Sequence, residues 1–213
     1  MKFSFPKPNQ VILVIIISEF IVTTGVGLVT PIYAIFVTQE VFAATATVVG
    51  FSVALYWLVK SILQLPIARY IDKNHGEIDD YYSMLIGVFL AVVATFLFYF
   101  ATKIWHVYVL QIMLGVADSF AVPPFYAIFT RHIDKDNEGF EWALRSSFSL
   151  GAGAALGGFF SGILAALVSF RIMFLINSGL TFIGFLILLF LRPYIRPRVS
   201  QSVERVFIEQ KRL

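Results

Sequence analysis

Six long apolar stretches divide this chain of 213 residues, and they constrain its fold more than any other feature. About 20 helical residues cross a hydrocarbon core roughly 30 Å thick, and each stretch is long enough to do so. The alternating pattern of a transmembrane β-strand is absent from them. The sequence therefore predicts an all-α membrane protein with six transmembrane helices, over residues 11–37, 47–68, 82–101, 105–129, 144–168 and 170–191.

Composition supports this fold class, because 59% of the residues are apolar and only 14% are charged. A chain so poor in polar groups could not cover a surface facing water. The sequence contains no cysteine, which excludes disulfides, thiolate metal ligands and a cysteine nucleophile. We expect three parts: a cytoplasmic segment (1–10), the transmembrane domain (11–192) and a basic amphipathic tail (193–213).

Positive charge is distributed unevenly between the predicted loops. With the N-terminus in the cytoplasm, only Lys103 and Arg171 of the 16 Lys and Arg residues lie outside, Lys60 lies within the second stretch, and the other 13 lie inside. This bias predicts a multi-pass protein of the plasma (inner) membrane with both termini cytoplasmic. The net charge of +3 is then explained by contact with the lipid bilayer, and no nucleic-acid partner is expected.

Three charged residues lie deep inside the apolar stretches: Glu19, Lys60 and Asp118. A charge at the bilayer centre costs at least about 2.5–3.5 kcal/mol, so it persists where a cavity or a partner receives it. At 1.5 Å per residue the three lie about 12, 13 and 16 Å from the cytoplasmic ends of their helices. We therefore expect a polar site at this depth, with Lys60 able to pair with one of the carboxylates. The alternative is that Lys60 reaches the headgroups and the carboxylates only join helices.

Each of these residues shares a helix face with other polar side chains, which we expect to line a substrate cavity. The expected cavity residues are Thr23 and Thr30 with Glu19, Trp57 and Gln64 with Lys60, and Gln111 with Asp118. The fifth stretch carries a different pattern, with small residues every four positions at Ser149, Gly153, Gly157 and Ser161. This spacing allows two helix backbones to approach closely, which favours a role in packing.

The order of several motifs resembles the N-terminal half of a major facilitator superfamily transporter. The similar segments are GLVTPIYAIFV in the first helix, VGFSVALYWLVKSILQLPIARYIDKNHG in the second helix and its loop, SLGAGAALGG in the fifth and SFRIMFLINSGL in the sixth. Asp72 and Lys73 match the loop motif of that family. Gln111 stands where the family often has Arg, and Ala154 replaces a Pro, so drug–proton antiport is not favoured.

The resemblance implies one half of a twelve-helix fold whose two halves are related by an axis along the membrane normal. It implies that the first and fourth helices line a central cavity, while the second and fifth meet the other half. The small-residue stripe of the fifth helix would then lie in a homodimer interface. Asp72 and Lys73 would form a cytoplasmic latch, with Asp72 paired to Arg131.

The leading expectation is a half-size secondary active transporter that works as a homodimer and moves a small organic solute by alternating access. Protons would be coupled through Glu19 and Asp118, with Lys60 as their electrostatic partner, because a poorly solvated site favours the neutral form of a carboxyl group. The alternatives are a uniporter or drug exporter of the same fold, a channel or non-transporting scaffold, and one part of a split or longer protein. No cofactor or metal is expected. An intramembrane enzyme such as a six-helix serine protease is not favoured, because it needs a His at membrane depth and the three His residues lie in loops or at helix ends.

Overall fold

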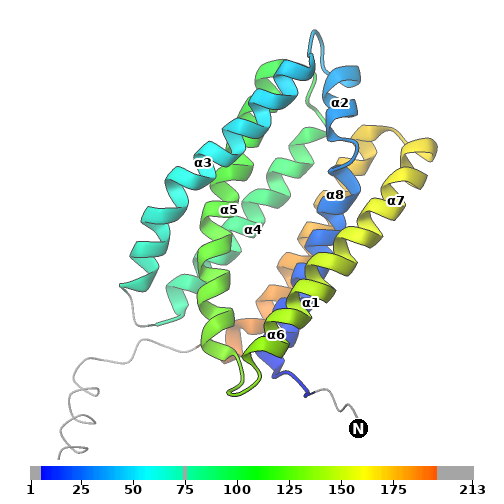
Figure 1. Ribbon diagram of the computed structural model, residues 1–213. Coiled ribbons are helices and arrows are strands. Elements are labelled where there is room, and N and C mark those ends of the chain that lie inside the picture. Colours follow the sequence, from blue (N-terminus) through cyan, green and yellow to red (C-terminus); the bar gives the residue numbers. More distant parts are fainter. Residues whose placement is uncertain (1–5, 74–75, 196–213) are drawn as a thin grey trace, which may run out of the picture.

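The computed structural model describes residues 6–73 and 76–195, and six helical spans long and apolar enough to cross a membrane run through them (Figure 1). This confirms the all-α, six-helix fold class. The elements are α1 (Gln10–Val29), α2 (Tyr33–Glu40), α3 (Ala46–Asp72), α4 (Ile78–Phe98), α5 (Ile104–His132), α6 (Glu138–Leu144), the π-helix η1 (Arg145–Ala152), α7 (Gly153–Leu167), α8 (Phe170–Leu188) and the 3-10 helix η2 (Leu189–Tyr194). The predicted tail beyond residue 195 lies outside the described residues.

The first predicted helix is interrupted, and α2 follows α1 after a turn at residues 30–32. Pro31 lies in this turn, where its missing N–H prevents a continuous helical hydrogen-bond ladder. The hydroxyl of Thr30 donates to the Val26 carbonyl at 2.8 Å, within the last turn of α1. Helix α2 extends to Glu40, three residues beyond the predicted end of the first stretch at residue 37.

The helices form two groups of three, which Figure 1 shows side by side. In one group, α5 packs against both α3 and α4; in the other, α1 packs against both α7 and α8. Packing of α4 against α8 joins the two groups. Tyr194 at the end of η2 donates a hydrogen bond to Gln10 at the start of α1, so the two ends of the described chain meet at one end of the bundle. The space between the two groups holds the candidate site.

The small-residue stripe packs α7 onto α1 of the same chain. A Cβ added to Gly157 would lie 2.7 Å from the Gly27 Cα, and one added to Gly153 would lie 3.0 Å from the Phe20 carbonyl oxygen. The stripe is buried at both ends, because Ser149 donates to a backbone carbonyl of α1 and Ser161 is 1% exposed. The close approach predicted from the spacing is thus confirmed, but the placement of Ser149, Gly153, Gly157 and Ser161 in a dimer interface is wrong.

The cytoplasmic pairing expected for Asp72 is also wrong. Arg131, at the end of α5, pairs with Asp80 in the first turn of α4. Asp80 is fully buried, whereas Asp72 is exposed at the end of α3. The loop motif predicted an acidic partner for Arg131 but selected the wrong aspartate, because Asp80 lies beyond the motif on the following helix.

This pairing predicts different effects for two aspartates that are close in sequence. Asp80→Asn should lower the free energy of unfolding by about 1–3 kcal/mol, since it removes a charged hydrogen-bond partner of Arg131 from a buried position. Asp72→Asn, the matched control, should change it by no more than about 0.5 kcal/mol. Thermal unfolding in detergent, followed by circular dichroism, measures both. Equal effects of the two substitutions would contradict the pairing.

Candidate functional site

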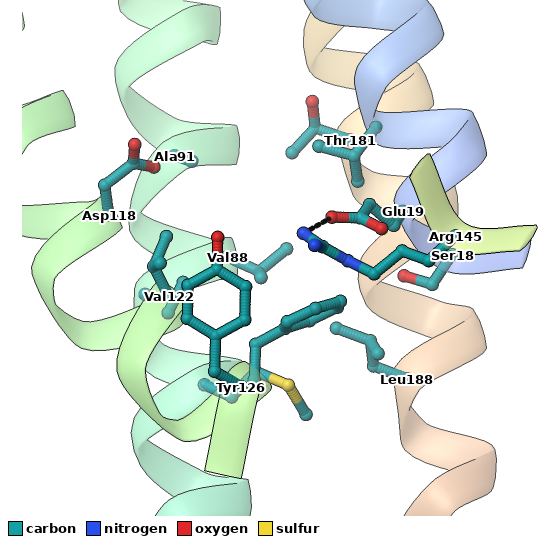
Figure 2. A pocket seen from close by; sticks show the side chains of 15 residues that line it. Ser18, Glu19, Val88, Ala91, Asp118, Val122, Tyr126, Arg145, Thr181 and Leu188 are labelled. Carbon is teal, nitrogen blue, oxygen red and sulfur yellow. Dashed lines mark hydrogen bonds and ion pairs between the residues drawn. The ribbon is translucent and has the colours of Figure 1, made fainter. Parts of the chain in front are cut away.

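Two adjoining cavities lie between the helix groups. The larger has a volume of about 520 Å³ and is lined by residues of α1 to α5 and α8. The smaller, of about 160 Å³, lies nearer the N-terminal end of α1 (Figure 2). Val22, Ala91, Asp118 and Thr181 line both, so the cavities meet at the middle of the bundle. Asp118 is the residue among these four that carries a charge.

Asp118 belongs to a cluster with two residues of α3. Its Oδ2 lies 2.8 Å from the Lys60 Nζ and accepts a hydrogen bond from the Tyr56 hydroxyl. The ammonium of Lys60 also donates to the Tyr56 hydroxyl at 3.2 Å. Residues 56 and 60 share a helix face at i, i+4, and both reach α5 because Gly115 lets the two helices approach closely: a Cβ there would lie 2.7 Å from the Tyr56 carbonyl oxygen. The predicted ion pair of Lys60 with one carboxylate is confirmed.

Glu19 pairs with Arg145, a residue at the cytoplasmic edge of the predicted fifth stretch (144–168). Arg145 Nη2 donates to Glu19 Oε1 at 2.6 Å, and the two side chains are 11% and 14% exposed (Figure 2). The guanidinium carbon also lies 4.8 Å from the centre of the Phe125 ring and 5.1 Å from that of Tyr126, within the range of cation–π contacts. The expectation that Lys60 is the electrostatic partner of Glu19 is therefore wrong.

Arg145 reaches this depth because the fifth span starts earlier than predicted. It runs from Glu138 through α6 and η1 into α7. Arg145 is the first residue of the π-helix η1. Its i→i+5 hydrogen bonds enclose one residue more than those of an α-helix, and such segments often occur at functional sites. The sequence feature that could have identified Arg145 as a site residue is its position four residues before Ser149, on the stripe that faces α1. However, a basic residue at the edge of an apolar stretch is equally typical of a loop.

The structure separates the expected cavity residues into two sets. Thr30, Trp57 and Gln111 line the larger cavity, as predicted. Thr23 faces α7, where its Cβ would lie 3.2 Å from a Cβ added to Gly153, and its placement in the cavity is wrong. Gln64 is half-buried on α3 and is not among the described residues that line either cavity.

The site therefore contains two ion pairs, each made of one acidic and one basic side chain. One pair lies on each helix group, beside a largely apolar space. Glu19–Arg145 links α1 to the fifth span, while Lys60–Asp118 links α3 to α5. Among the described residues, no group of three or more His, Asp or Glu side chains could hold a metal ion. Such an arrangement can bind a polar group of a solute at mid-depth, because a partner of each charge is already present.

Comparison with known proteins agrees with the fold. The family model of the major facilitator superfamily matches residues 15–211. An uncharacterized MFS-type transporter of Methanocaldococcus jannaschii is 26% identical over 173 residues, which cover 79% of this chain and 42% of that protein. Multidrug resistance protein MdtG of Proteus mirabilis is 38% identical over 93 residues, which cover 43% of this chain and 22% of that protein.

The aligned region spans less than half the length of either relative, and the family model covers most of the six-helix domain described above. The motif order, the six spans and the family match all agree. This chain belongs to the major facilitator superfamily.

Proposed function

We propose that the chain supplies one half of a transport pathway that carries a small organic solute across the membrane by alternating access. The observation that carries this proposal is the meeting of two cavities at Asp118, with an ion pair on each of the two helix groups. Two groups of three helices joined mainly through α4 and α8 can rock against each other or against a second unit. The ion pairs are polar contacts that such a motion can break and form again.

The second half is proposed to be another copy of this chain, docked on α3 and the fifth span. In the apolar 18-residue segment of each span, only 11% of the residues of α3 and 17% of those of the fifth span are buried. The share is 39–44% in the other four spans. On the fifth span, Gly158 and Gly162 have nothing within 4 Å of an added Cβ, so this face is open to a close partner. Native mass spectrometry of the protein released from nanodiscs tests the proposal, which predicts the mass of two chains. A monomer mass alone would contradict the homodimer.

Transport itself is tested with proteoliposomes. Sugars, amino acids and lipophilic cations are first screened for a shift in the melting temperature of the purified protein at two pH values. Each compound that shifts it is then tested for saturable counterflow, in which external label accumulates against a preloaded unlabelled pool. Saturable counterflow supports a transporter, whereas ionic current without saturation would support the alternative of a channel.

We propose further that Asp118 and Glu19 couple transport to protons. Protonation of either carboxyl group would break its ion pair and free the basic partner, which links proton occupancy to helix position. Glu19→Gln is expected to keep counterflow but to reduce accumulation driven by a pH gradient at least tenfold, because the amide keeps the shape without titrating. Asp118→Asn should reduce this accumulation at least as strongly.

Uptake under an imposed pH gradient measures this effect. Asp136→Asn, in the loop between α5 and α6, is the matched control and should behave like the unaltered chain. If both cavity variants accumulate solute like this control, protons are not coupled through these carboxylates. The uniporter alternative would then be favoured.

The partial match to a multidrug resistance protein supports a second candidate within the same fold, a drug exporter. Its test is resistance: cells that produce the chain would tolerate a panel of toxic lipophilic compounds better than cells that produce Asp118→Asn.

A further inference from the structure

We propose that Asp118, Tyr56 and Trp57 form a binding site for the ammonium group of an organic amine, and that Lys60 occupies this site when no solute is bound. The proposal rests on the transport function above and names its solute class as organic amines with an apolar body.

The surroundings of the Lys60 ammonium are those that a bound amine would need. It has a carboxylate oxygen of Asp118 at 2.8 Å and the hydroxyl oxygen of Tyr56 at 3.2 Å. It also lies 5.1 Å from the centre of the Trp57 ring and 5.5 Å from that of Tyr56. A carboxylate combined with aromatic faces is the usual protein environment for alkylammonium ligands, because the ring quadrupole and the negative charge both attract the cation.

These groups are accessible to a solute. Asp118, Tyr56 and Trp57 all line the larger cavity, and the side chain of Asp118 is 32% exposed. The hydrogen bonds of Asp118 within the described part of the chain all reach Oδ2, so Oδ1 has no described hydrogen-bond partner there. The structure therefore offers a carboxylate at a cavity wall and not a sealed ion pair.

The rest of the cavity wall selects the class of solute. Among the described residues that line it, Asp118 is the one with a formal charge, and the remainder are apolar, aromatic or uncharged polar. Tyr33, Phe98 and Phe174 contribute aromatic surface. A solute cation can pair with this carboxylate, and the aromatic and aliphatic side chains of the wall suit an apolar body. An amine with an apolar body matches both the charge and the surface.

Exchange of Lys60 for a solute ammonium leaves one cation paired with Asp118. Asp118 stays paired throughout, so the cost of an isolated buried carboxylate is avoided. The four-carbon stem of lysine is flexible, which lets Lys60 leave without a change in the helix. Because the site is open only in the fraction of molecules from which Lys60 has moved, the apparent affinity for an amine is reduced by that fraction.

The test compares three probes with one carbon skeleton: 3-phenylpropylamine, 3-phenylpropanol and 3-phenylpropanoate. Binding to the purified full chain in nanodiscs is measured by equilibrium dialysis of the labelled compounds. The amine is expected to bind at least tenfold more tightly than the alcohol or the carboxylate. Equal or weaker binding of the amine would overturn the proposal, and this comparison needs no variant.

Variants then test the role of Lys60. Lys60→Met should tighten binding of the amine at least tenfold and leave binding of the alcohol unchanged. The double variant Lys60→Met with Asp118→Asn, which removes both charges together, should lose the preference for the amine. Lys135→Met, at an exposed loop position, is the matched control. Weaker binding of the amine to Lys60→Met than to this control would show that Lys60 helps to bind the solute, contrary to the proposal.

Counterflow separates the failure of this inference from the failure of the transport function. Saturable counterflow of the alcohol or the carboxylate without the amine would keep the transport function and remove the amine class. Saturable counterflow of the amine, abolished by the double variant, would support both.

Discussion

Replacing Arg145 with methionine is expected to destabilise the protein by about 3–5 kcal/mol, the usual cost of leaving a buried charge without its partner. The guanidinium donates to Glu19 at 2.6 Å, and the Glu19 side chain is only 14% exposed. The substitution also removes the cation from the faces of Phe125 and Tyr126. Thermal unfolding in detergent, measured by circular dichroism, gives the size of the loss.

The matched control is Arg69→Met, at an exposed position near the end of α3, which should change stability by no more than about 0.5 kcal/mol. The double variant Arg145→Met with Glu19→Gln should recover most of the loss, since no unpaired charge remains. A double-mutant cycle isolates this coupling. If Arg145→Met and Arg69→Met have similar effects, Glu19 does not depend on Arg145, and the pair has no role in holding the fifth span on α1.

The fold could be predicted closely because the membrane imposes strong rules on sequence. A spanning segment must be long, apolar and helical, so the fourth stretch, predicted at 105–129, lies within α5 at Ile104–His132. The break after α1 follows from Pro31. Prediction failed at the start of the fifth span. The short helix α6 contains Glu138 and Glu141, so it does not look like part of an apolar stretch, yet it extends the span to Glu138.

The site was only partly predictable, because sequence gives depth and helix face but not neighbours. The sequence predicted that Lys60 could pair with a carboxylate at similar depth but left open which one, and the structure shows that it is Asp118. Arg145 was missed because a basic residue at the edge of a stretch satisfies the rule for a cytoplasmic loop equally well. Glycine spacing likewise predicts a close helix contact without saying which helix is in contact. Here the contact is with α1, in the same chain.

Two adjacent glycines of α7 separate packing within the chain from contact with a second copy. Gly157→Leu is expected to prevent stable folding, with a loss of about 3 kcal/mol or more, because overpacking of a tight contact forces the backbone apart. A Cβ at this position would lie 2.7 Å from the Gly27 Cα, so relief requires α7 to move away from α1. That movement would also break the hydrogen bond of Ser149 to Ile16 and strain the Glu19–Arg145 pair.

Gly158→Leu provides the comparison, because nothing lies within 4 Å of an added Cβ there. It should fold and melt like the unaltered chain in detergent. If a second copy docks on this face, however, the larger side chain should shift the mass in native mass spectrometry from dimer to monomer. Loss of folding in both variants would show that the open face of α7 is required within the chain. Normal folding of both would contradict the close packing of α7 on α1, since no leucine fits at Gly157 without separating the two helices.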